Sequence, residues 1–289
     1  MQVALIWHVC RKHWPRVHRD KYDVCMRKQY MIYFLGDVHG RFRHILPAIQ
    51  KSDPKSKVEK SVIFLGDIEP QRPFEDEIRP LLDAGIAVWF IHGNHDTDYF
   101  RTWDFLQPSW HRNLHGRVVS INGVQVAGLG GIFRGEIWYP KSEIEKPPIT
   151  SRKQYEANKK FRQYARNFVA AGDSTQQPGP SLSGLKHRSS IFYDDWLQLS
   201  SVSADILVTH EAPDCHPHGF KALTELARAM RVKTLYHGHQ HDNLNYRRFD
   251  GIQGFRSFGV GLRGIKDMSG DDILPGALDM VRDQRSTTL

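Results

Sequence analysis

The stretch Met31-Ile32-Tyr33-Phe34-Leu35-Gly36-Asp37-Val38-His39-Gly40 decides the fold class of this 289-residue chain. Its first half is a short apolar run rich in residues that favour β-structure, and Gly36 ends it, which is typical of a buried strand. Its second half carries an aspartate and a histidine two residues apart. The stretch therefore predicts a buried strand followed by a turn that presents chemically active side chains.

The same pattern recurs downstream. Residues 62–65 and 87–91 are also short apolar runs, and each precedes a turn that contains glycine. Helix-like segments separate the three runs, at residues 43–50 and 73–84, and the second has a proline and three acidic residues in its first turn. Alternating strands and helices predict an α/β fold.

A second group of strands is expected further along the chain, so two sheets are plausible. Its first two members flank Asn122-Gly123, the strongest short hairpin signal. A helix is expected around 220–232, and the last segment of the group suggests a terminal hairpin turning at Asp250-Gly251. The expected strands are residues 118–121, 124–127, 205–209 and 234–236, with the hairpin over 246–260.

These patterns predict one domain over residues 31–265, with an insertion at about 134–190 and a loose C-terminal tail over 266–289. The insertion predicts a helix whose aromatic residues pack against the domain, followed by a mobile loop at 172–190. The aromatic residues at near-helical spacing are Tyr155, Phe161, Tyr164 and Phe168. Residues 1–30 show neither helical nor strand periodicity, so we expect an extension that is either not native or disordered, with Met31 as the natural start.

The composition is that of an ordinary globular protein, with 40% hydrophobic and 25% charged residues, which excludes a disordered or fibrous chain. The formal net charge of +8 would favour nucleic-acid binding, but residues 1–30 hold seven basic and two acidic side chains and so carry most of the excess. Three cysteines form no disulfide framework, and the apolar start is too short to span a membrane. We therefore expect a cytoplasmic protein without membrane contact.

Polar side chains follow five of the predicted strands at the point where each strand ends. In open α/β sheets this edge is where ligands bind, because the loops converge there. Any one of these short motifs is weak evidence, whereas all five in order and on strand ends are a strong signal. The side chains are Asp37, His39, Asp67, Asn94, His95, Asp96, His210, His239 and His241.

The residue types at this edge indicate a metal centre. Apart from Asp96, two carboxylates, one amide and five imidazoles form an oxygen and nitrogen donor set without thiolate, which suits Mn, Fe or Zn. Using all of these donors requires two divalent ions. Such a pair, roughly 3.5–4 Å apart, holds phosphoryl oxygens and converts a shared water into hydroxide near neutral pH.

The order D-x-H, G-D, G-N-H-D, H, G-H-x-H resembles that of the calcineurin-like metallophosphoesterases over about residues 31–260. The resemblance implies a four-layer α/β/β/α sandwich with two mixed β-sheets. It also implies that His95 stabilises the phosphate and protonates the leaving oxygen. The implied ligands are Asp37, His39 and His241 for the first metal and Asn94, His210 and His239 for the second, with Asp67 as the bridge.

The second motif departs from the Ser/Thr protein phosphatase version, which reads G-D-x-x-D-R-G. Pro70 stands where that version has the carboxylate that orients the catalytic histidine, and Gln71 stands where it has an arginine that holds phosphate. These two differences argue against protein phosphatase activity. The candidates that remain for these roles are Asp96, as a catalytic residue beside His95, and Arg41, Arg72 and Arg134, as substrate-binding residues.

The sequence therefore predicts a metal-dependent hydrolase of phosphate monoesters or diesters, with nucleotides and nucleic acids among the candidate substrates and no protein partner indicated. The alternatives are a nuclease acting on RNA or DNA and a non-catalytic nucleic-acid-binding module on the same fold. The intact ligand set argues against the module. A serine hydrolase is set aside because the G-x-S-x-G motif is absent from the sequence.

Overall fold

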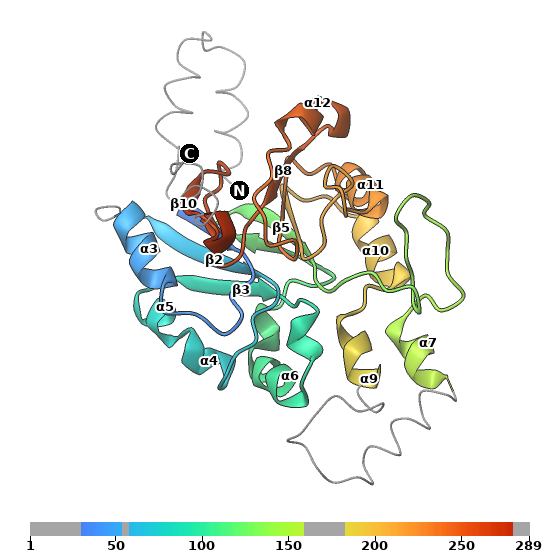
Figure 1. The fold of residues 1–289 in the computed structure, drawn as a ribbon, viewed down its shortest axis with the longest axis horizontal. Coiled ribbons are helices and arrows are strands. Elements are labelled where there is room, and N and C mark those ends of the chain that lie inside the picture. The colour runs from blue at the N-terminus through green and yellow to red at the C-terminus, as the bar shows by residue number, and fades with distance from the viewer. Residues whose placement is uncertain (1–29, 54–57, 159–182, 280–289) are drawn as a thin grey trace, which may run out of the picture.

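Two five-stranded β-sheets form the centre of the protein in the computed structural model, which describes residues 30–53, 58–158 and 183–279 (Figure 1). In the first sheet the strand order is β10-β9-β1-β2-β3, and in the second it is β4-β5-β6-β7-β8. The first sheet contains β1 (Tyr30–Leu35), β2 (Glu59–Leu65), β3 (Ala87–Ile91), β9 (Ile265–Lys266) and β10 (Asp272–Leu274). The second contains β4 (Arg117–Ile121), β5 (Val124–Leu129), β6 (Ile206–Thr209), β7 (Thr234–His237) and β8 (Arg256–Gly259).

Both sheets are mixed. In the first, β1, β2 and β3 are parallel, and β9 and β10 continue the sheet in antiparallel fashion. In the second, β5 to β8 are parallel and the hairpin partner β4 is antiparallel. The expected α/β fold with two mixed sheets is therefore confirmed.

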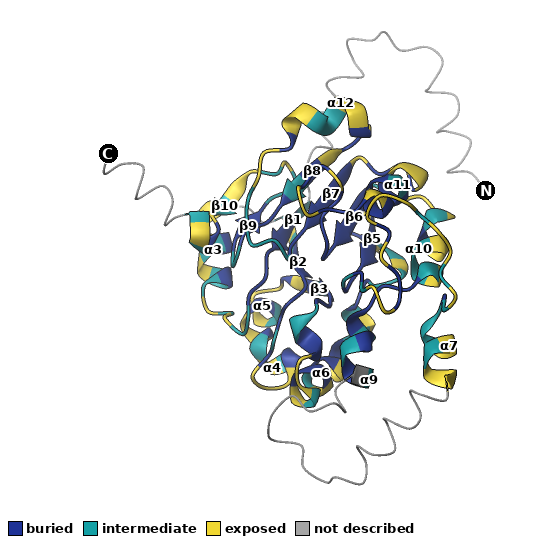
Figure 2. Cartoon of the chain, turned by 45° about the vertical axis from the view of Figure 1, so that its right-hand side comes forward, coloured by how far each residue is buried: buried dark blue, intermediate teal, exposed yellow. Residues whose placement is uncertain are grey.

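Three hydrophobic clusters lie between the layers of the fold. Successive side chains of a strand point to opposite faces, so each sheet contributes apolar side chains to the clusters on both of its sides. From β1, Ile32 and Phe34 face the second sheet and join a core between the sheets, where the Phe34 ring stacks on Tyr236 at 3.6 Å. Tyr33 and Leu35 face the other way, into the first helix layer. The central strands are thus buried on both sides, as the dark blue strands of Figure 2 show, whereas the edge strands β4 and β10 are more exposed.

Helices cover the outer face of each sheet (Figure 1). Those on the first sheet are α3 (Ile45–Ser52), α4 (Phe74–Glu77) and α5 (Arg79–Asp83), and those on the second are α10 (Tyr193–Ser200) and α11 (Lys221–Ala229). Further helices are α6 (Phe100–Leu106), α7 (Arg152–Ala157), α9 (Ser183–Lys186) and α12 (Asp250–Gln253), with short 3₁₀ turns η1 (His95–Thr97), η2 (Gln107–Arg112), η4 (His187–Ser189) and η5 (Arg247–Phe249). The order of layers is helix, sheet, sheet, helix.

The single helix predicted over 73–84 is wrong, because two short helices meet at Ile78. Pro80 lies at the start of the second helix. Proline has no N–H to donate to the preceding turn, so a continuous helix would lack a hydrogen bond at this position. Each of the two helices still buries an apolar side chain against the first sheet, Phe74 and Leu81 respectively.

The terminal hairpin predicted over 246–260 is also wrong. The Asp250-Gly251 pair begins the short helix α12, which ends at Gly254 in the left-handed conformation that suits glycine. The single strand β8 then pairs in parallel with β7 instead of folding back on itself. A turn-forming dipeptide is therefore not sufficient evidence for a hairpin here.

The loose tail predicted from residue 266 is wrong for residues 266–279. Ile265 is fully buried beside β1, and the short strands β9 and β10 extend the first sheet. Lys266 is only 4% exposed and its Nζ lies 2.7 Å from Asp272 Oδ1. A buried lysine paired with a more exposed aspartate at the sheet edge explains why this segment looks polar in sequence although it is structured.

Part of the predicted insertion can be placed. Tyr155 lies in α7 and packs against the helix layer of the second sheet, as expected of a packing residue. The other predicted helix aromatics, Phe161, Tyr164 and Phe168, lie outside the described residues, as does most of the predicted loop at 172–190. Residues 1–29 of the expected extension are outside them too. Among the described helices, none is both long and apolar enough to cross a bilayer.

Candidate metal centre

The predicted ligands all lie in loops at the carboxyl ends of β1, β2, β3, β6 and β7. The backbones of the first two loops are joined directly, since His39 N donates to Asp67 O at 3.0 Å and Gly40 N donates to Ile68 O at 2.9 Å. The β7 loop joins them through His239 N, which donates to the Asp37 carboxylate at 2.9 Å. Two sheets thus contribute to one site.

A first group of donor atoms gathers around Asp37. The Nε2 atom of His241 lies 3.0 Å from Asp37 Oδ2 and 3.2 Å from His39 Nε2. Asp67 contributes a fourth donor, and all four donor atoms lie within 4.8 Å of one another. These are the residues expected for the first metal together with the expected bridge.

A second group gathers on the other side of Asp67. It contains Asp67, His210 and His239, whose donor atoms again lie within 4.8 Å of one another. The Nε2 atom of His210 is 3.4 Å from Asp67 Oδ1 and 3.1 Å from the side-chain oxygen of Asn94. Asp67 therefore belongs to both groups, which is the geometry of a bridging ligand.

The spacing of these atoms fits metal coordination. For a metal–ligand bond of roughly 2.1 Å, neighbouring ligand atoms lie about 3.0 to 3.4 Å apart, depending on the coordination angle. The distances of 3.0, 3.2, 3.1 and 3.4 Å fall in this range. In addition, Asp67 Oδ2 is buried and has no hydrogen-bond partner among the described residues, so a buried acceptor is available to a cation.

The backbone around the site is strained. Of the eight described non-glycine residues with positive φ, five lie in these loops, and such conformations cost about 1–3 kcal/mol each. The five are His39, Asp67, Glu69, His239 and His241. These left-handed conformations direct side chains from separate loops to one centre, and backbone strain of this kind is typical of functional sites.

Glycine is required where two loops approach each other. A side chain at Gly93 would overlap the Asp67 carboxylate, and one at Gly238 would overlap the Asp37 carboxylate. The glycines that precede Asn94 and His239 are therefore part of the site, because only they leave room for the acidic ligands.

Two histidine rings are held in place through their Nδ1 atoms. His39 Nδ1 donates to Glu69 Oε2 at 2.7 Å, and His210 Nδ1 donates to the backbone oxygen of Leu65 at 2.7 Å. Each bond leaves Nε2 free to act as a ligand, which is the common arrangement around protein-bound metals. Sequence analysis missed Glu69, although its position two residues after Asp67 was a signal that it lies in the same loop.

His95 lies beside the centre without belonging to either ligand group. Its backbone N–H donates to Asp67 Oδ1 at 2.8 Å, and its ring Nδ1 lies 2.6 Å from Asp98 Oδ2. The hydrogen bond with Asp98, helped by the negative charge of Asp67, raises the pKa of His95 to about 9 although burial opposes the shift. The ring therefore favours its protonated form, which can donate a proton.

The carboxylate at the His95 ring is Asp98, and not the predicted Asp96. Asp96 is fully buried, and its two oxygens accept the backbone N–H groups of Ile68, Glu69 and Gly93 at 2.8 Å each. Asp96 thus ties the β2 and β3 loops together. This arrangement suits a positioning role, because its hydrogen bonds hold the loops that carry the ligands.

The structure separates the three predicted substrate-binding arginines. Arg134 is near the centre: its Nη1 atom is buried and has no partner in the part of the chain that the structure describes, and its charge acts on Asp98 and Asp67. Burial raises the pKa of the neighbouring Glu211 to about 7, and this side chain, which sequence analysis missed, accepts the backbone N–H of Phe133. Arg41 and Arg72 instead line a groove beside the centre.

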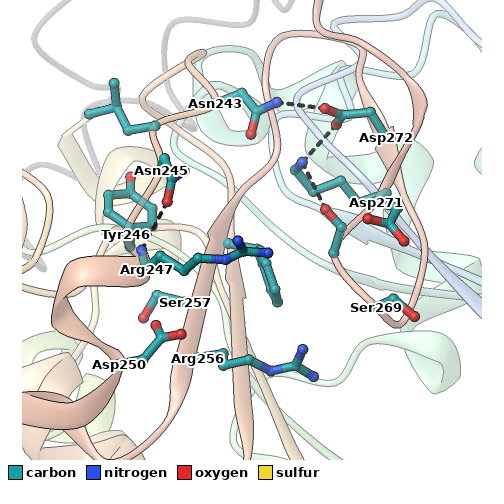
Figure 3. A pocket seen from close by; sticks show the side chains of 14 residues that line it. Asn243, Asn245, Tyr246, Arg247, Asp250, Arg256, Ser257, Ser269, Asp271 and Asp272 are labelled. Atoms are coloured by element: carbon teal, nitrogen blue, oxygen red, sulfur yellow. Dashed lines mark hydrogen bonds and ion pairs between the residues drawn. The ribbon is translucent and has the colours of Figure 1, made fainter.

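A separate cavity of about 400 Å³ lies between β8 and the β9–β10 edge (Figure 3). Its walls carry Arg247 and Arg256, but also Asp250 and Asp271, so its charges are mixed. None of the predicted ligands lines it. This cavity is therefore not the metal centre.

Several known proteins are similar to this chain. The model of the calcineurin-like phosphoesterase family matches residues 30–243, a range that contains all five ligand loops. An uncharacterized protein of Haemophilus influenzae is 37% identical over 246 residues, which cover 84% of this chain and 96% of that protein. The crystal structure of TT1561 of Thermus thermophilus aligns with a TM-score of 0.45 and 13% identity, covering 83% of this chain and 98% of that one.

Proposed function

The chain belongs to the calcineurin-like phosphoesterase family, and from this premise we propose that it hydrolyses phosphate monoesters or diesters with two divalent metal ions, Mn, Fe or Zn. Asp37, His39 and His241 would hold the first ion and Asn94, His210 and His239 the second. Asp67 would bridge them. The bound ions would supply a hydroxide nucleophile and neutralise the charge of the phosphoryl oxygens.

The observation that carries this proposal is the double membership of Asp67. Its carboxylate lies in both groups of donor atoms, and one of its oxygens is buried without a partner. A protein that bound nucleic acid without catalysis would have no need for such a costly buried acceptor. We therefore prefer an enzyme to the binding module.

The protein's own side chains would complete the reaction. Arg134 has a buried, unpartnered nitrogen near the second ligand group and would hold a phosphoryl oxygen, since charge-assisted hydrogen bonds to phosphate are strong. His95, placed by its bonds to Asp67 and Asp98, would donate a proton to the leaving oxygen. We also propose a cytoplasmic location, since Cys215 is a buried free thiol and the composition needs no disulfide.

The test combines metal content with turnover. We expect protein purified and reconstituted with Mn²⁺ to bind about two ions per chain and to hydrolyse p-nitrophenyl phosphate or its bis-ester. The Asp67→Asn variant removes the bridging charge and should lose at least one ion and roughly 100-fold or more in kcat/KM. Elemental analysis and steady-state kinetics measure both effects.

Asp76→Asn is the matched control, because Asp76 is exposed on α4 and lies outside both ligand groups. It should keep the metal content and the activity of the wild type. Full activity of the Asp67 variant would contradict the proposal. Comparing the monoester, the bis-ester and a single-stranded oligonucleotide then separates phosphatase, phosphodiesterase and nuclease.

A further inference from the structure

We propose that the groove beside the metal centre binds a second phosphate group of the substrate, so that the substrate carries at least two phosphates, joined directly or through a sugar, and is not a simple monoester. This inference rests on the proposed function, which it deepens by naming the substrate class. The groove measures about 1030 Å³ and is lined by residues of the segments 40–47 and 71–81. Pockets for small ligands typically measure roughly 300–1,000 Å³, so this one has room for more than an aryl phosphate.

The groove begins at the metal centre itself. Gly40 and Gln71 both line it. Gly40 directly follows His39, and Gln71 comes two residues after Glu69. The His39 and Glu69 side chains are joined by a hydrogen bond. The backbone bond from Gly40 N to Ile68 O fixes these two loops side by side. A substrate whose scissile phosphate lies at the metals can therefore extend directly into the groove.

The charges along the groove are mainly positive. Arg41, Arg43 and Arg72 are exposed and line it, against one acidic lining residue, Glu77. Within the described residues, neither Arg41 nor Arg43 has an acidic partner within 4.0 Å, whereas Arg72 Nε lies 3.3 Å from Glu77 Oε2. Two guanidinium groups are thus available to an anion, and guanidinium matches the geometry of phosphate oxygens.

A fourth cation adds to the positive potential at the same edge. Arg263 N donates to the backbone oxygen of Asp37, and the Arg263 Nε atom is buried without a partner. Its charge acts on that of Arg41, which lines the groove, so the positive potential extends from the groove to the loop of Asp37.

The floor of the groove is partly apolar. Phe42, Leu46 and Leu81 line it and also pack against the helix layer of the first sheet. Such a floor accommodates the sugar or base between two phosphates, while the arginines hold the charged groups. The shared chemistry is therefore a scissile phosphate linked to another phosphate, as in a nucleoside polyphosphate or a short oligonucleotide.

The experiment compares substrates with one and with several phosphates. We expect wild-type kcat/KM to favour adenosine triphosphate or a tetranucleotide over p-nitrophenyl phosphate, and the preferred one identifies the linkage. In the double variant Arg41→Ala/Arg43→Ala this ratio should fall by about tenfold, mostly through KM, since two charge-assisted contacts are lost. Circular dichroism and metal content check that the variant is folded and loaded.

Lys51→Ala is the control, because Lys51 is an exposed cation on α3 outside the groove lining and its loss also lowers the net charge. It should leave the ratio within about twofold of the wild type, as expected for a surface charge. An equal ratio in the double variant and the control, or a wild type that prefers p-nitrophenyl phosphate, would overturn the inference while the proposed function stands.

Binding of a fluorescent tetranucleotide to metal-free protein gives a second readout that needs no turnover. Its affinity should fall with salt and fall again in the double variant. If the protein hydrolyses no phosphate ester with any metal, the proposed function is contradicted. In that case the difference in tetranucleotide affinity between the double variant and Lys51→Ala, measured by fluorescence anisotropy, still decides whether the groove binds phosphates.

Discussion

At the scale of single residues, the centre depends on side chains that hold the ligands as much as on the ligands themselves. Glu69 fixes the His39 ring, Asp98 contacts the His95 ring, and Asp96 accepts three backbone N–H groups that tie two loops together. In phosphoesterase chemistry such partners are needed because a ring that rotates away from its productive position loses most of its effect.

The hydrogen bond between Asp98 and His95 predicts that the effect of losing Asp98 depends on the leaving group of the substrate. In Asp98→Asn the ring loses its charged partner, so protonation of the leaving oxygen should suffer. We expect kcat/KM to fall by roughly 10- to 100-fold for an alkyl phosphate, whose leaving group needs the proton, and much less for p-nitrophenyl phosphate. Steady-state kinetics on the two substrates measure the difference.

Asp98→Glu is the conservative variant and should restore part of the alkyl phosphate activity, because it keeps a carboxylate within reach of the ring. If Asp98→Asn lowers turnover of both substrates equally, Asp98 serves the structure of the loop and does not act through His95.

At the scale of secondary-structure elements, the strands are determined by burial on both faces. Phe34 in β1 lies between the two sheets at 0% exposure and stacks on Tyr236 of β7. Asp37 follows two residues after the end of this strand, so the packing that fixes β1 also fixes the first ligand loop. The helices on the outer face of the first sheet are less regular than its central strands, as the break between α4 and α5 at Ile78 illustrates.

The packing of Phe34 predicts a large loss of stability on truncation. Phe34→Ala leaves a cavity between the sheets and should lower the free energy of unfolding by about 3–5 kcal/mol. Ile252→Ala is the control, since Ile252 is 75% exposed on α12 and its truncation should change stability by less than about 0.5 kcal/mol. Urea unfolding followed by fluorescence compares the two, and equal midpoints would contradict the assigned core.

At the scale of the whole molecule, the domain keeps several histidines neutral in its interior. His187 is 6% exposed, its Nδ1 lies 2.9 Å from Ser190 Oγ, and its ring packs against Tyr155. Burial lowers its pKa to about 4. The negative charge of Glu136 opposes this shift, and the positive charges of Lys186, Arg134 and Arg152 add to it. Folding therefore competes with protonation at acidic pH.

The direction of this pH dependence follows from the two pKa values. The unfolded chain binds a proton at His187 near pH 6.5 and the folded chain only near pH 4, so the stability contribution is complete above pH 6.5 and is lost as the pH falls towards 4. The loss should reach about 1–3 kcal/mol. Thermal unfolding at pH 7.5 and 5.0 measures it.

His187→Asn keeps a side-chain donor without a titrating ring and should flatten the dependence. His218→Asn, at an exposed histidine, should leave it as in the wild type. Identical pH profiles for His187→Asn and the wild type would show that other groups control acid stability.

Taken alone, the sequence determined the strands β1 to β7, the order of the ligand motifs and the family resemblance, because apolar runs and short polar motifs are local properties of the chain. Only the tertiary structure decided what joins distant segments. It placed Asp67 in both donor groups, brought Glu69 to His39 across 30 residues, assigned the His95 ring to Asp98 and built the arginine groove from two separate loops. It also turned the predicted tail into the sheet edge. The physical reason is the same in each case. Left-handed turns, the close approach of two loops at a glycine and the pairing of a buried lysine all depend on neighbours that are remote in sequence. A local sequence pattern therefore does not predict them.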